Sequence, residues 1–466
     1  MYGIKEAAAA LINAEVTARQ LVDDCLARIE DPTGEGARAF LIVYGDAVRA
    51  QADAVDQARA AGHSLPPFAG VPISIKDLFD IAGEVTTAGS HVLDDQPAAV
   101  RDAPVMARLK QAGFIFLGKT NMTEFAYSGL GLNTHYPPPL NPYDRQSERI
   151  PGGSTSGGAV SVADGMALAT IGTDTGGSCR IPAAFCGIVG FKSTTWRIPR
   201  DGVIPLSKTL DSVGPLAASV ACCAVLDDVM SGGAGEDVEA FPALGLRLGV
   251  LRNYVTENTD QAVGEAVDQA LVRLSKKGVQ LTPLTIEELE RLPVINHNGG
   301  YVGAEAYAWH RDLLESRGGY YDPWVYARFE AGKAQSAADF ICLAEERAEL
   351  IDQIHCQTRH FDAVIMPSVA IIPPTLEELK DAEVANATNR LVLRNTAIGN
   401  FLDRPVISLP CHEPGQAPVG VMLMGESGDD RRLLAIARGL EDTIQLDQQK
   451  IFNREGSSWE PLLPSV

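Results

Sequence analysis

Short apolar runs alternate with helix-like segments along most of this sequence, and that alternation restricts the fold more than any other feature. Short apolar runs bounded by glycine and proline predict β-strands, whereas apolar residues spaced three or four apart predict amphipathic helices. The predicted strands lie within residues 71–77, 114–118, 167–172, 187–192, 246–255, 361–369, 405–410 and 418–425. The predicted helices lie within residues 4–30, 46–62, 102–113, 157–165, 261–276 and 429–444, and residues 295–345 are mostly helical. This alternation predicts an α/β fold in which helices cover both faces of a sheet.

The charge balance of the chain argues against some classes of partner. Lys and Arg number 39 and Asp and Glu number 60, so the formal net charge is −21 (39 − 60). A negative surface repels phosphate backbones and anionic lipids, which argues against binding to nucleic acid or membranes. Charged residues interrupt residues 1–30, and no run of about 18 apolar residues occurs, so we expect neither a signal peptide nor a membrane span.

The eight cysteines are scattered along the chain. None forms a C-x-x-C pair, and no Cys/His spacing suits a zinc site. Thiols spread in this way are typical of a reduced protein, so we predict a cytoplasmic location. No repeat, low-complexity tract or long linker divides the sequence, which favours one domain with insertions.

Two clusters of glycine and serine stand close together in the chain. Residues 152–158 read GGSTSGG and residues 172–178 read GTDTGGS. Glycine-rich backbone can hold an anion, whereas a serine hydroxyl can attack a carbonyl carbon. Residues 113–120 also match the phosphate-loop expression G-x4-G-K-T, but their four middle residues are themselves a predicted strand. A phosphate loop must follow its strand, so we do not expect nucleotide binding there.

A serine nucleophile needs a base, and the histidines are poorly placed for that role. No histidine lies between residues 136 and 296, which contain both clusters, and no GxSxG motif surrounds their serines. A histidine from elsewhere in the fold could still complete a Ser–His arrangement. Lys76 is the alternative base, because it ends a predicted strand and burial lowers the pKa of a lysine. Taken alone, a strand-end lysine beside an aspartate such as Asp77 is more often a structural residue in a salt bridge.

The second cluster can form an oxyanion site. Gly176 and Gly177 can adopt backbone conformations that other residues avoid. Successive N–H groups can then point at one spot, beside the hydroxyl of Ser178, as stabilisation of an oxyanion requires. A glycine turn that merely joins a strand to a helix would have the same sequence, so both interpretations stay open at this point.

These segments and their neighbours resemble the amidase signature family. The resemblance is dense over residues 66–216 and returns in three later segments. The segments that carry it are GVPISIKDLFDIAG, GKTNMTEFAYSG, PGGSTSGGAVSVADGMALATIGTDTGGSCRIPAAFCGIVGFKST, LDSVGPLA, VIMPSVAIIP, TAIGNFLDRPVISLP and PVGVMLMG. The resemblance implies a large central mixed β-sheet covered on both faces by helices, and a Ser–cis-Ser–Lys catalytic triad.

The resemblance implies roles for individual residues. Lys76 matches the base, Ser154 matches the bridging serine that follows a cis peptide bond, and Ser178 matches the nucleophile. The positions that match the oxyanion hole are Thr175, Gly176, Gly177 and the N–H of Ser178. Asp174 and Arg180 match positions that hold this loop in shape.

The resemblance also implies which residues line the substrate site and where the chain departs from the family. Ala126 and Tyr127 are expected in the lining, together with residues 295–345 and the loop near 365–373. Thr155, Cys179 and Ser193 stand where serine, an aliphatic residue and proline are usual. None of these departures removes a reacting group, and we expect Cys179 to have a packing role.

By the same resemblance, residues 1–466 form a single amidase domain with four parts. Residues 1–65 contribute N-terminal helices, and residues 66–230 form the signature core with the catalytic residues. Residues 231–365 form a variable, mostly helical insertion that lines the substrate site. Residues 366–466 contribute strands and a helix that complete the sheet.

The implied function is hydrolysis of the C–N bond of small neutral amides, including aryl amides (anilides), through an acyl-enzyme on Ser178. Esters and carbamates (urethanes) are further candidate substrates. The reaction requires no metal or organic cofactor, and we expect a monomer or a homodimer. Two alternatives stay open: the glutaminase subunit of a tRNA-dependent amidotransferase, which needs a partner protein, and a non-catalytic scaffold of the same fold. The joint presence of Lys76, Ser154 and Ser178 argues against the scaffold.

Overall fold

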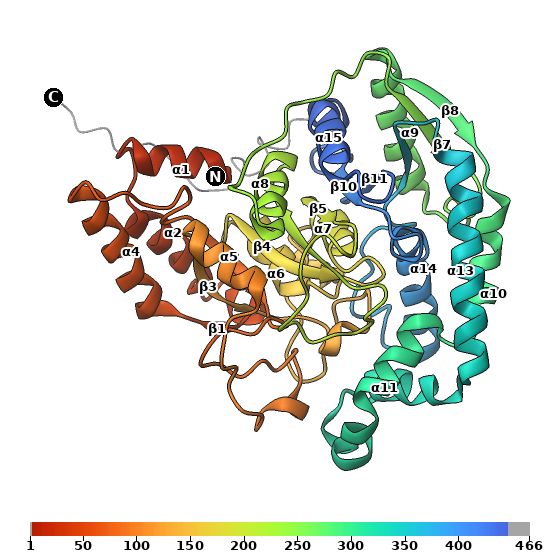
Figure 1. Ribbon diagram of the computed structural model, residues 1–466, viewed down its shortest axis with the longest axis horizontal. Helices are drawn as coiled ribbons and strands as arrows, with labels where there is room; N and C mark the ends of the chain where they lie inside the picture. The colour runs from red at the N-terminus through yellow and green to blue at the C-terminus, as the bar shows by residue number, and fades with distance from the viewer. Residues whose placement is uncertain (1, 446–466) are drawn as a thin grey trace.

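One mixed β-sheet of 11 strands runs through the molecule in the computed structural model, which describes residues 2–445 (Figure 1). The strand order is β1-β3-β2-β4-β6-β5-β10-β11-β9-β7-β8. The strands are β1 (Phe40–Val43), β2 (Pro72–Lys76), β3 (Ile115–Thr120), β4 (Ala169–Asp174), β5 (Val189–Lys192), β6 (Ser212–Ala217), β7 (Arg247–Leu251), β8 (Gln280–Leu284), β9 (Ala363–Pro367), β10 (Val406–Pro410) and β11 (Gly420–Met424). The last part of the predicted C-terminal segment, residues 446–466, lies outside the described residues.

The pairing of the strands makes the sheet mixed, which confirms the prediction. β2 is parallel to β3 and β4, and β7 is parallel to β8 and β9, whereas the other pairs are antiparallel. Because β2 and β4 are parallel neighbours, their carboxyl ends meet at the same edge of the sheet. Lys76 ends β2 and Asp174 ends β4, so this edge brings together two residues of the predicted site.

Helices cover both faces of the sheet, as the alternating sequence predicts. On one face, a Cβ placed on Gly190 of β5 would lie 2.6 Å from the Cβ of Ala183 in α7. On the other face, the Sγ of Cys223 in α8 lies 3.9 Å from the carbonyl oxygen of Val189. The helices are α1 (Ile4–Ile12), α2 (Ala18–Ile29), α3 (Gly36–Ala39), α4 (Gly45–Ala60), α5 (Pro104–Ala112), α6 (Ser156–Ala163), α7 (Arg180–Cys186), α8 (Val220–Ser231), α9 (Gln261–Lys276), α10 (Leu292–Ile295), α11 (Gly300–Arg317), α12 (Pro323–Ala331), α13 (Ala337–Thr358), α14 (Ala382–Phe401) and α15 (Asp430–Ile444).

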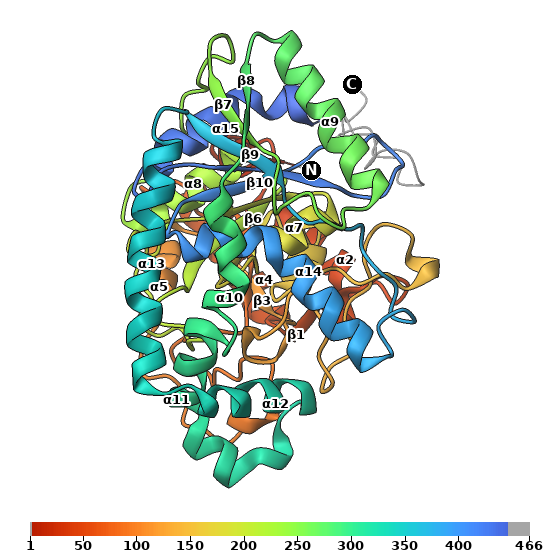
Figure 2. The same ribbon diagram turned by 90° about the vertical axis from the view of Figure 1, so that its right-hand side faces the viewer.

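The helices from α10 to α13 form an outer layer at one side of the molecule (Figure 2). α11 and α12 lie at the far end from α9 and α15 in this view, and α13 runs along the flank of the molecule. Within residues 2–445, no helix is both long and apolar enough to cross a membrane.

The N-terminal segment differs from its prediction. The helical spacing over residues 4–30 predicts one continuous helix, whereas the structure has α1 and α2 with a break between them. Ala14 has a positive φ of 57° in this break. The hydroxyl of Thr17 then accepts a hydrogen bond from the N–H of Gln20, and the two residues form a capping box that starts α2. Thr-x-x-Gln is a sequence signal for a new helix, and it outweighs the apolar spacing.

Three strands of the sheet were not among the predicted ones. β1 has only four residues. β6 contains Gly214 and Pro215, and β8 contains Pro283. Glycine and proline occur rarely inside strands. β7 and β8 nevertheless bring part of residues 231–365 into the central sheet, where β8 forms one edge.

Candidate active site

Lys76 is completely buried at the end of β2, and its amine contacts two hydroxyl groups. Its Nζ lies 2.7 Å from the Oγ of Ser154 and 3.0 Å from the Oγ1 of Thr173. No carboxylate of the described chain lies within ion-pair distance of this amine. Burial lowers the pKa of Lys76 to about 8, although the charges of Asp174 and Asp211 oppose part of the shift. A lysine in this range is partly neutral near physiological pH and can accept a proton.

The carboxylate next to Lys76 in sequence is engaged elsewhere. Asp77 Oδ1 lies 3.5 Å from the Nζ of Lys119 in β3, and both side chains are buried. Asp77 Oδ2 accepts hydrogen bonds from the hydroxyl of Thr87 and from the N–H of Gly89 at 3.1 Å. The salt bridge considered for Lys76 and Asp77 is therefore absent, because Lys119 takes the place of Lys76 as the partner of Asp77. Lys119 itself lies within a strand, so the segment around it is not a phosphate loop.

Ser154 lies in the loop that precedes α6, and hydrogen bonds of the backbone fix its position. The N–H of Gly153 donates to the carbonyl oxygen of Gly129 at 2.8 Å. The N–H of Thr123 donates to the carbonyl oxygen of Ser154 at 3.1 Å. The peptide bond between Gly153 and Ser154 is cis. A Cβ on Gly153 would lie 2.6 Å from the backbone nitrogen of Gly131, so this close approach of two loops requires glycine.

Ser178 lies in the loop between β4 and α7, next to the chain that carries Ser154. The N–H of Thr155 donates to the carbonyl oxygen of Ser178 at 3.3 Å, which holds the two loops together. Ser178 is 3% exposed, and its hydroxyl makes no hydrogen bond with any residue from 2 to 445. The structure therefore joins Lys76 to Ser154 by a hydrogen bond between side chains, and joins Ser178 to this pair through the backbone.

The glycines before Ser178 let the loop approach α14 closely. Gly177 has a φ of 140°, and a Cβ there would lie 2.2 Å from the Oγ1 of Thr396. The hydroxyl of Thr396 donates to the carbonyl oxygen of Gly176 at 2.6 Å. The N–H groups of Gly176, Gly177 and Ser178 find no acceptor in the part of the chain that the structure describes. Consecutive N–H groups without acceptors are suited to stabilise an oxyanion.

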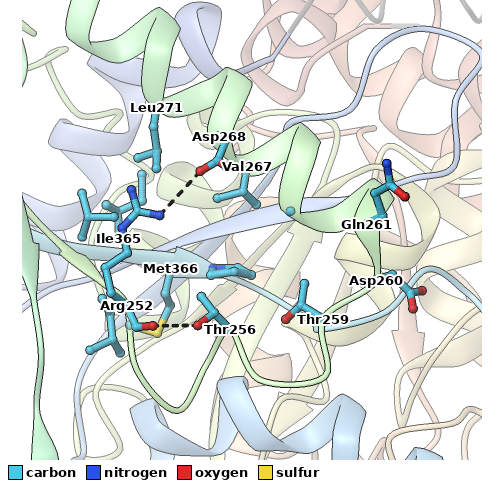
Figure 3. A pocket seen from close by; sticks show the side chains of 14 residues that line it. Arg252, Thr256, Thr259, Asp260, Gln261, Val267, Asp268, Leu271, Ile365 and Met366 are labelled. Carbon is cyan, nitrogen blue, oxygen red and sulfur yellow. Dashed lines mark hydrogen bonds and ion pairs between the residues drawn. The ribbon is translucent and has the colours of Figure 1, made fainter.

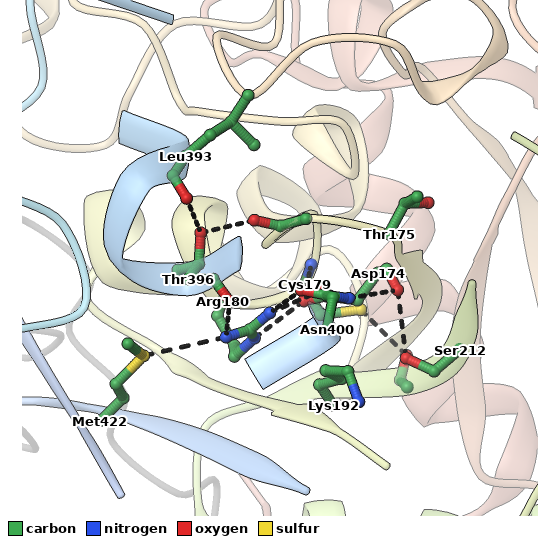
Figure 4. A network of polar contacts seen from close by, with 12 residues as sticks. Asp174, Thr175, Cys179, Arg180, Lys192, Ser212, Leu393, Thr396, Asn400 and Met422 are labelled. Atoms are coloured by element: carbon green, nitrogen blue, oxygen red, sulfur yellow. Dashed lines mark hydrogen bonds and ion pairs between the residues drawn. The ribbon is translucent and has the colours of Figure 1, made fainter. Parts of the chain in front are cut away.

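A fully buried ion pair joins the two ends of the Ser178 loop (Figure 4). The guanidinium of Arg180 donates to the carboxylate of Asp174 through Nη2 at 2.8 Å and Nε at 3.0 Å. Arg180 also donates to the carbonyl oxygen of Thr396 at 2.8 Å and to Oδ1 of Asn400 at 2.7 Å. Burial alone would raise the pKa of Asp174, but Arg180 and Asn400 hold that pKa at about 2. The network therefore fixes the loop between β4 and α7 against α14.

A second buried carboxylate supports the same loop. Asp211 accepts a hydrogen bond from the hydroxyl of Thr175 and from the N–H groups of Leu206 and Ser207, the latter two at 3.0 Å. Burial raises the pKa of Asp211 to about 6, although these hydrogen bonds oppose the shift. Asp211 stands in the segment LDSVGPLA that carries the family resemblance, but no sequence pattern marks it as part of the site.

Aromatic side chains of α11 and α12 cover the segment that contains Ala126 and Tyr127. Ala126 has a positive φ of 62°. Arg328 donates to the carbonyl oxygen of Tyr127 at 2.7 Å, and the ring of Tyr127 lies 5.2 Å from that of Phe329. His310 stacks on Phe329 with ring centroids 3.8 Å apart, and burial lowers the pKa of His310 to about 3. Aromatic side chains from residues 295–345, which we expected in the substrate lining, therefore pack against the segment that contains Tyr127.

A cavity of about 480 Å³ borders the site. Thr173, Asp211 and Trp309 are among the residues that line it. Thr173 contacts the amine of Lys76, Asp211 holds Thr175, and Trp309 belongs to α11. The volume lies within the range of about 300 to 1,000 Å³ that is usual for small-molecule sites.

A second cavity, of about 320 Å³, lies between α9 and the ends of β7 and β9 (Figure 3). Ile365, Met366 and Pro367 line this cavity, and none of the residues matched to catalysis does. Arg252 and Asp268 form an ion pair of 3.5 Å in its wall. The start of the loop near 365–373, which we expected in the substrate lining, therefore faces a separate cavity.

The thiol of Cys179, next to the candidate nucleophile Ser178, packs in the interior of the protein. Cys179 is completely buried, and its Sγ contacts the carbonyl oxygen of Gly214 at 3.6 Å. Burial raises the pKa of this thiol well above its usual range, which keeps it protonated and unreactive. Among residues 2–445, no group of three or more His, Cys, Asp or Glu side chains is arranged to hold a metal ion.

Comparison with known proteins agrees with this architecture. The sequence matches the Amidase family over residues 20–434. It is 34% identical to the 2-amino-5-chloromuconic acid deaminase of Comamonas testosteroni, over 95% of this chain and 96% of that protein. It is 33% identical to the A subunit of the glutamyl-tRNA(Gln) amidotransferase of Synechococcus sp. (strain WH7803), over 94% of this chain and 96% of that protein. A crystal structure of an amidase superposes with a TM-score of 0.86 at 28% identity, over 95% of this chain and 100% of that chain. The chain therefore belongs to the amidase family of amide hydrolases.

Proposed function

We propose that this protein cleaves amides through an acyl-enzyme on Ser178, with Ser154 and Lys76 as its proton relay. The observation that carries the proposal is the 2.7 Å contact between the buried amine of Lys76 and the Oγ of Ser154. In the described chain this amine has no carboxylate partner that would keep it protonated, and burial lowers its pKa to about 8. A neutral amine can accept a proton from the hydroxyl that it contacts.

In the first step, Ser178 Oγ attacks the carbonyl carbon of the amide. Ser178 gives its proton to Ser154 Oγ, and Ser154 gives its own to Lys76 Nζ. The Ser178 hydroxyl has no hydrogen-bond partner among residues 2–445, so rotation about its side-chain bond breaks no existing contact. The N–H groups of Gly176, Gly177 and Ser178 stabilise the oxyanion, which is worth about 3 kcal/mol for a well-placed donor.

In the second step, the relay runs in reverse. Ser154 returns a proton to the nitrogen of the tetrahedral intermediate, because an amide anion is a very poor leaving group. The C–N bond breaks, the amine leaves, and the acyl group remains on Ser178. Water then gives a proton to the same relay and attacks the acyl-enzyme. The bond to Ser178 Oγ breaks, the relay returns the proton to that oxygen, and the acid is released.

The substrates that we propose are small amides, with esters and carbamates as further carbonyl compounds that the same nucleophile can attack. The cavity of about 480 Å³ supports a small molecule rather than a polymer. Similarity to 2-amino-5-chloromuconic acid deaminase supports cleavage of a C–N bond.

The glutaminase subunit of an amidotransferase is a second candidate, because the chain is 33% identical to such a component of a glutamyl-tRNA(Gln) amidotransferase over nearly its whole length. Amide turnover by the isolated chain, checked by gel filtration for the absence of a partner, supports the free amidase. Glutamine turnover that appears only with an added ATP-using partner protein supports the amidotransferase.

The decisive experiment on the proposed function is labelling with a fluorophosphonate probe, followed by mass spectrometry. We expect the adduct on Ser178, and we expect Ser178→Ala to lose both the adduct and the hydrolysis of a panel of primary amides, anilides and carbamates. Hydrolysis that persists in Ser178→Ala would refute Ser178 as the nucleophile. An absence of both activity and labelling in the natural protein would refute the proposal and favour a scaffold.

A further inference from the structure

The cavity of about 480 Å³ carries two cationic side chains that form no ion pair within residues 2–445. Arg200 and Lys208 both line it. Neither of them forms an ion pair with any carboxylate of residues 2–445. This is notable in a chain whose formal net charge is −21, because carboxylates are in excess over cations.

The two acidic side chains that line the same cavity are not in ion-pair contact with these cations, although the charge of Arg200 opposes part of the rise in the pKa of Asp211. Asp211 is buried, and its carboxylate already accepts three hydrogen bonds from the surrounding loop. Asp201 is exposed, and it contacts neither Arg200 nor Lys208.

The guanidinium of Arg200 retains free donors. Its Nη1 donates to the carbonyl oxygens of Lys208 at 2.6 Å and of Asp211 at 2.9 Å. These bonds fix the side chain in place but do not involve Nε or Nη2. Nε and Nη2 have no acceptor in the described structure, and neither has the Nζ of Lys208. A fixed guanidinium with two free N–H groups matches the two oxygens of a carboxylate.

We infer that the substrate carries a carboxylate in addition to the amide, and that Arg200 and Lys208 bind this carboxylate. The inference rests on the proposed function, because it concerns the substrate of the Ser178 site. It replaces the expectation that the substrates are neutral amides. Net charge describes the average surface, whereas the lining of this cavity holds as many cations as carboxylates, two of each.

The geometry also indicates how the substrate lies. Arg200 contacts the backbone of Asp211, and the carboxylate of Asp211 holds Thr175 at the start of the Ser178 loop. Arg200 is therefore linked through Asp211 to the start of the Ser178 loop, and a carboxylate on Arg200 would lie on that side of the loop. Trp309 lines the same cavity and provides an apolar surface for the carbon chain between the two polar ends.

The first test compares primary amides of equal length that differ in one charge. Succinamate and glutaramate carry a carboxylate, whereas butyramide and valeramide do not. We expect kcat/KM to be about tenfold or more higher for the charged compounds, since a charge-assisted hydrogen bond contributes that factor. This preference should fall as the salt concentration rises. Equal kcat/KM values for the two classes would overturn the inference.

The second test removes the cations. Lys208→Met should lower kcat/KM for succinamate about threefold, through KM, and leave butyramide unchanged, because an exposed cation contributes little. Arg200→Gln should lower kcat/KM for succinamate about tenfold or more. Arg200→Lys should lose less, because it keeps the charge. Lys276→Met, which removes an exposed lysine from α9, is the control and should change neither substrate. Equal losses on charged and neutral amides would show that Arg200 only supports the loop, and would overturn the inference.

A binding measurement separates failure of this inference from failure of the proposed function. Succinamate should slow the labelling of Ser178 by a fluorophosphonate at concentrations where butyramide does not. Labelling of Ser178 with equal protection, or no protection, by the two amides would overturn the carboxylate site alone. Absence of labelling at Ser178 would overturn the proposed function and the inference with it.

Discussion

Two lysines end strands of the same sheet, and both are completely buried, yet they have different partners. Burial lowers the pKa of Lys76 and that of Lys192 to about 8. The amine of Lys76, at the end of β2, contacts the hydroxyls of Ser154 and Thr173. The amine of Lys192, at the end of β5, donates to two backbone carbonyl oxygens at 2.9 and 3.0 Å. Those carbonyls belong to Ser193 and Arg404.

The difference between these partners determines what each lysine can do. A carbonyl oxygen only accepts hydrogen bonds, so an amine beside it is held as a donor and finds no proton to take. A hydroxyl both donates and accepts, so a neutral amine beside it can receive the hydroxyl proton. Burial therefore brings both lysines into the titration range of a base, but only the surroundings of Lys76 supply a proton donor.

The largest effect that we predict tests the difference between Lys76 and Lys192 directly. Lys76→Met should lower kcat/KM for amides about a thousandfold, because general base catalysis contributes a factor of that order. Lys192→Met should keep kcat within about tenfold. It should lower the free energy of unfolding by about 2 kcal/mol, because it leaves buried carbonyl oxygens without a donor. Steady-state kinetics and urea unfolding of both variants provide the measurement, and a large loss of kcat in Lys192→Met would show that the two sites do not differ as described.

Removal of the Ser154 hydroxyl should affect amide and ester substrates differently, which tests whether Lys76 acts through this hydroxyl. Ser154→Ala should lower kcat/KM for an amide about a hundredfold. The loss for an activated ester should be about tenfold smaller, because an alkoxide leaves without the returned proton. The measurement is the ratio of amide to ester kcat/KM in the variant and in the natural protein. An unchanged ratio would refute the proton return through Ser154.

The loop between β4 and α7 should tolerate no side chain at Gly177. Gly177→Ala should lower kcat about tenfold or more, because the new Cβ would meet the Oγ1 of Thr396 at 2.2 Å and displace the N–H donors. Gly415→Ala is a matched control, since Gly415 also has a positive φ, of 85°, but has nothing within 4 Å of the added Cβ. Comparable kcat losses in the two variants would mean that backbone strain, rather than the position of the loop, causes the effect.

The smallest predicted effect concerns the second hydroxyl at Lys76. Thr173→Val removes one hydrogen bond from the amine and should lower kcat/KM about threefold to tenfold. Thr170→Val is the control on the same strand, because the buried hydroxyl of Thr170 has no hydrogen-bond partner among the residues described. Initial-rate kinetics with one amide substrate are sufficient. If Thr170→Val has the same effect as Thr173→Val, the contact between Thr173 and Lys76 does not matter for catalysis.

Much of the fold could be predicted from sequence because burial leaves a local pattern. Strands such as β2, β4 and β10 are buried on both faces and appear as short apolar runs. β1, β6 and β8 were missed because they are short or contain glycine and proline. The break between α1 and α2 was missed because apolar spacing continues across it.

The candidate reacting residues could be singled out from the sequence because each stands in a distinctive local segment, whereas the residues that support them could not. Lys76, Ser154 and Ser178 stand in glycine-rich or strand-end segments that the sequence shows directly. Asn400 reaches Arg180 from 220 residues away, and only the packing of α14 on the loop brings the two together. The burial of Lys192, and its carbonyl partners, likewise depends on neighbouring strands that the sequence pattern does not place.

The most direct test of the proton relay is the pH dependence of the rate at which a fluorophosphonate modifies Ser178. If neutral Lys76 is the base, the second-order rate constant should rise about tenfold per pH unit below the pKa of Lys76, which is about 8, and should level off above it. Lys192→Met should keep this profile, and Lys76→Met should lose it. A rate that does not change with pH through this range, or an unchanged profile in Lys76→Met, would contradict the account.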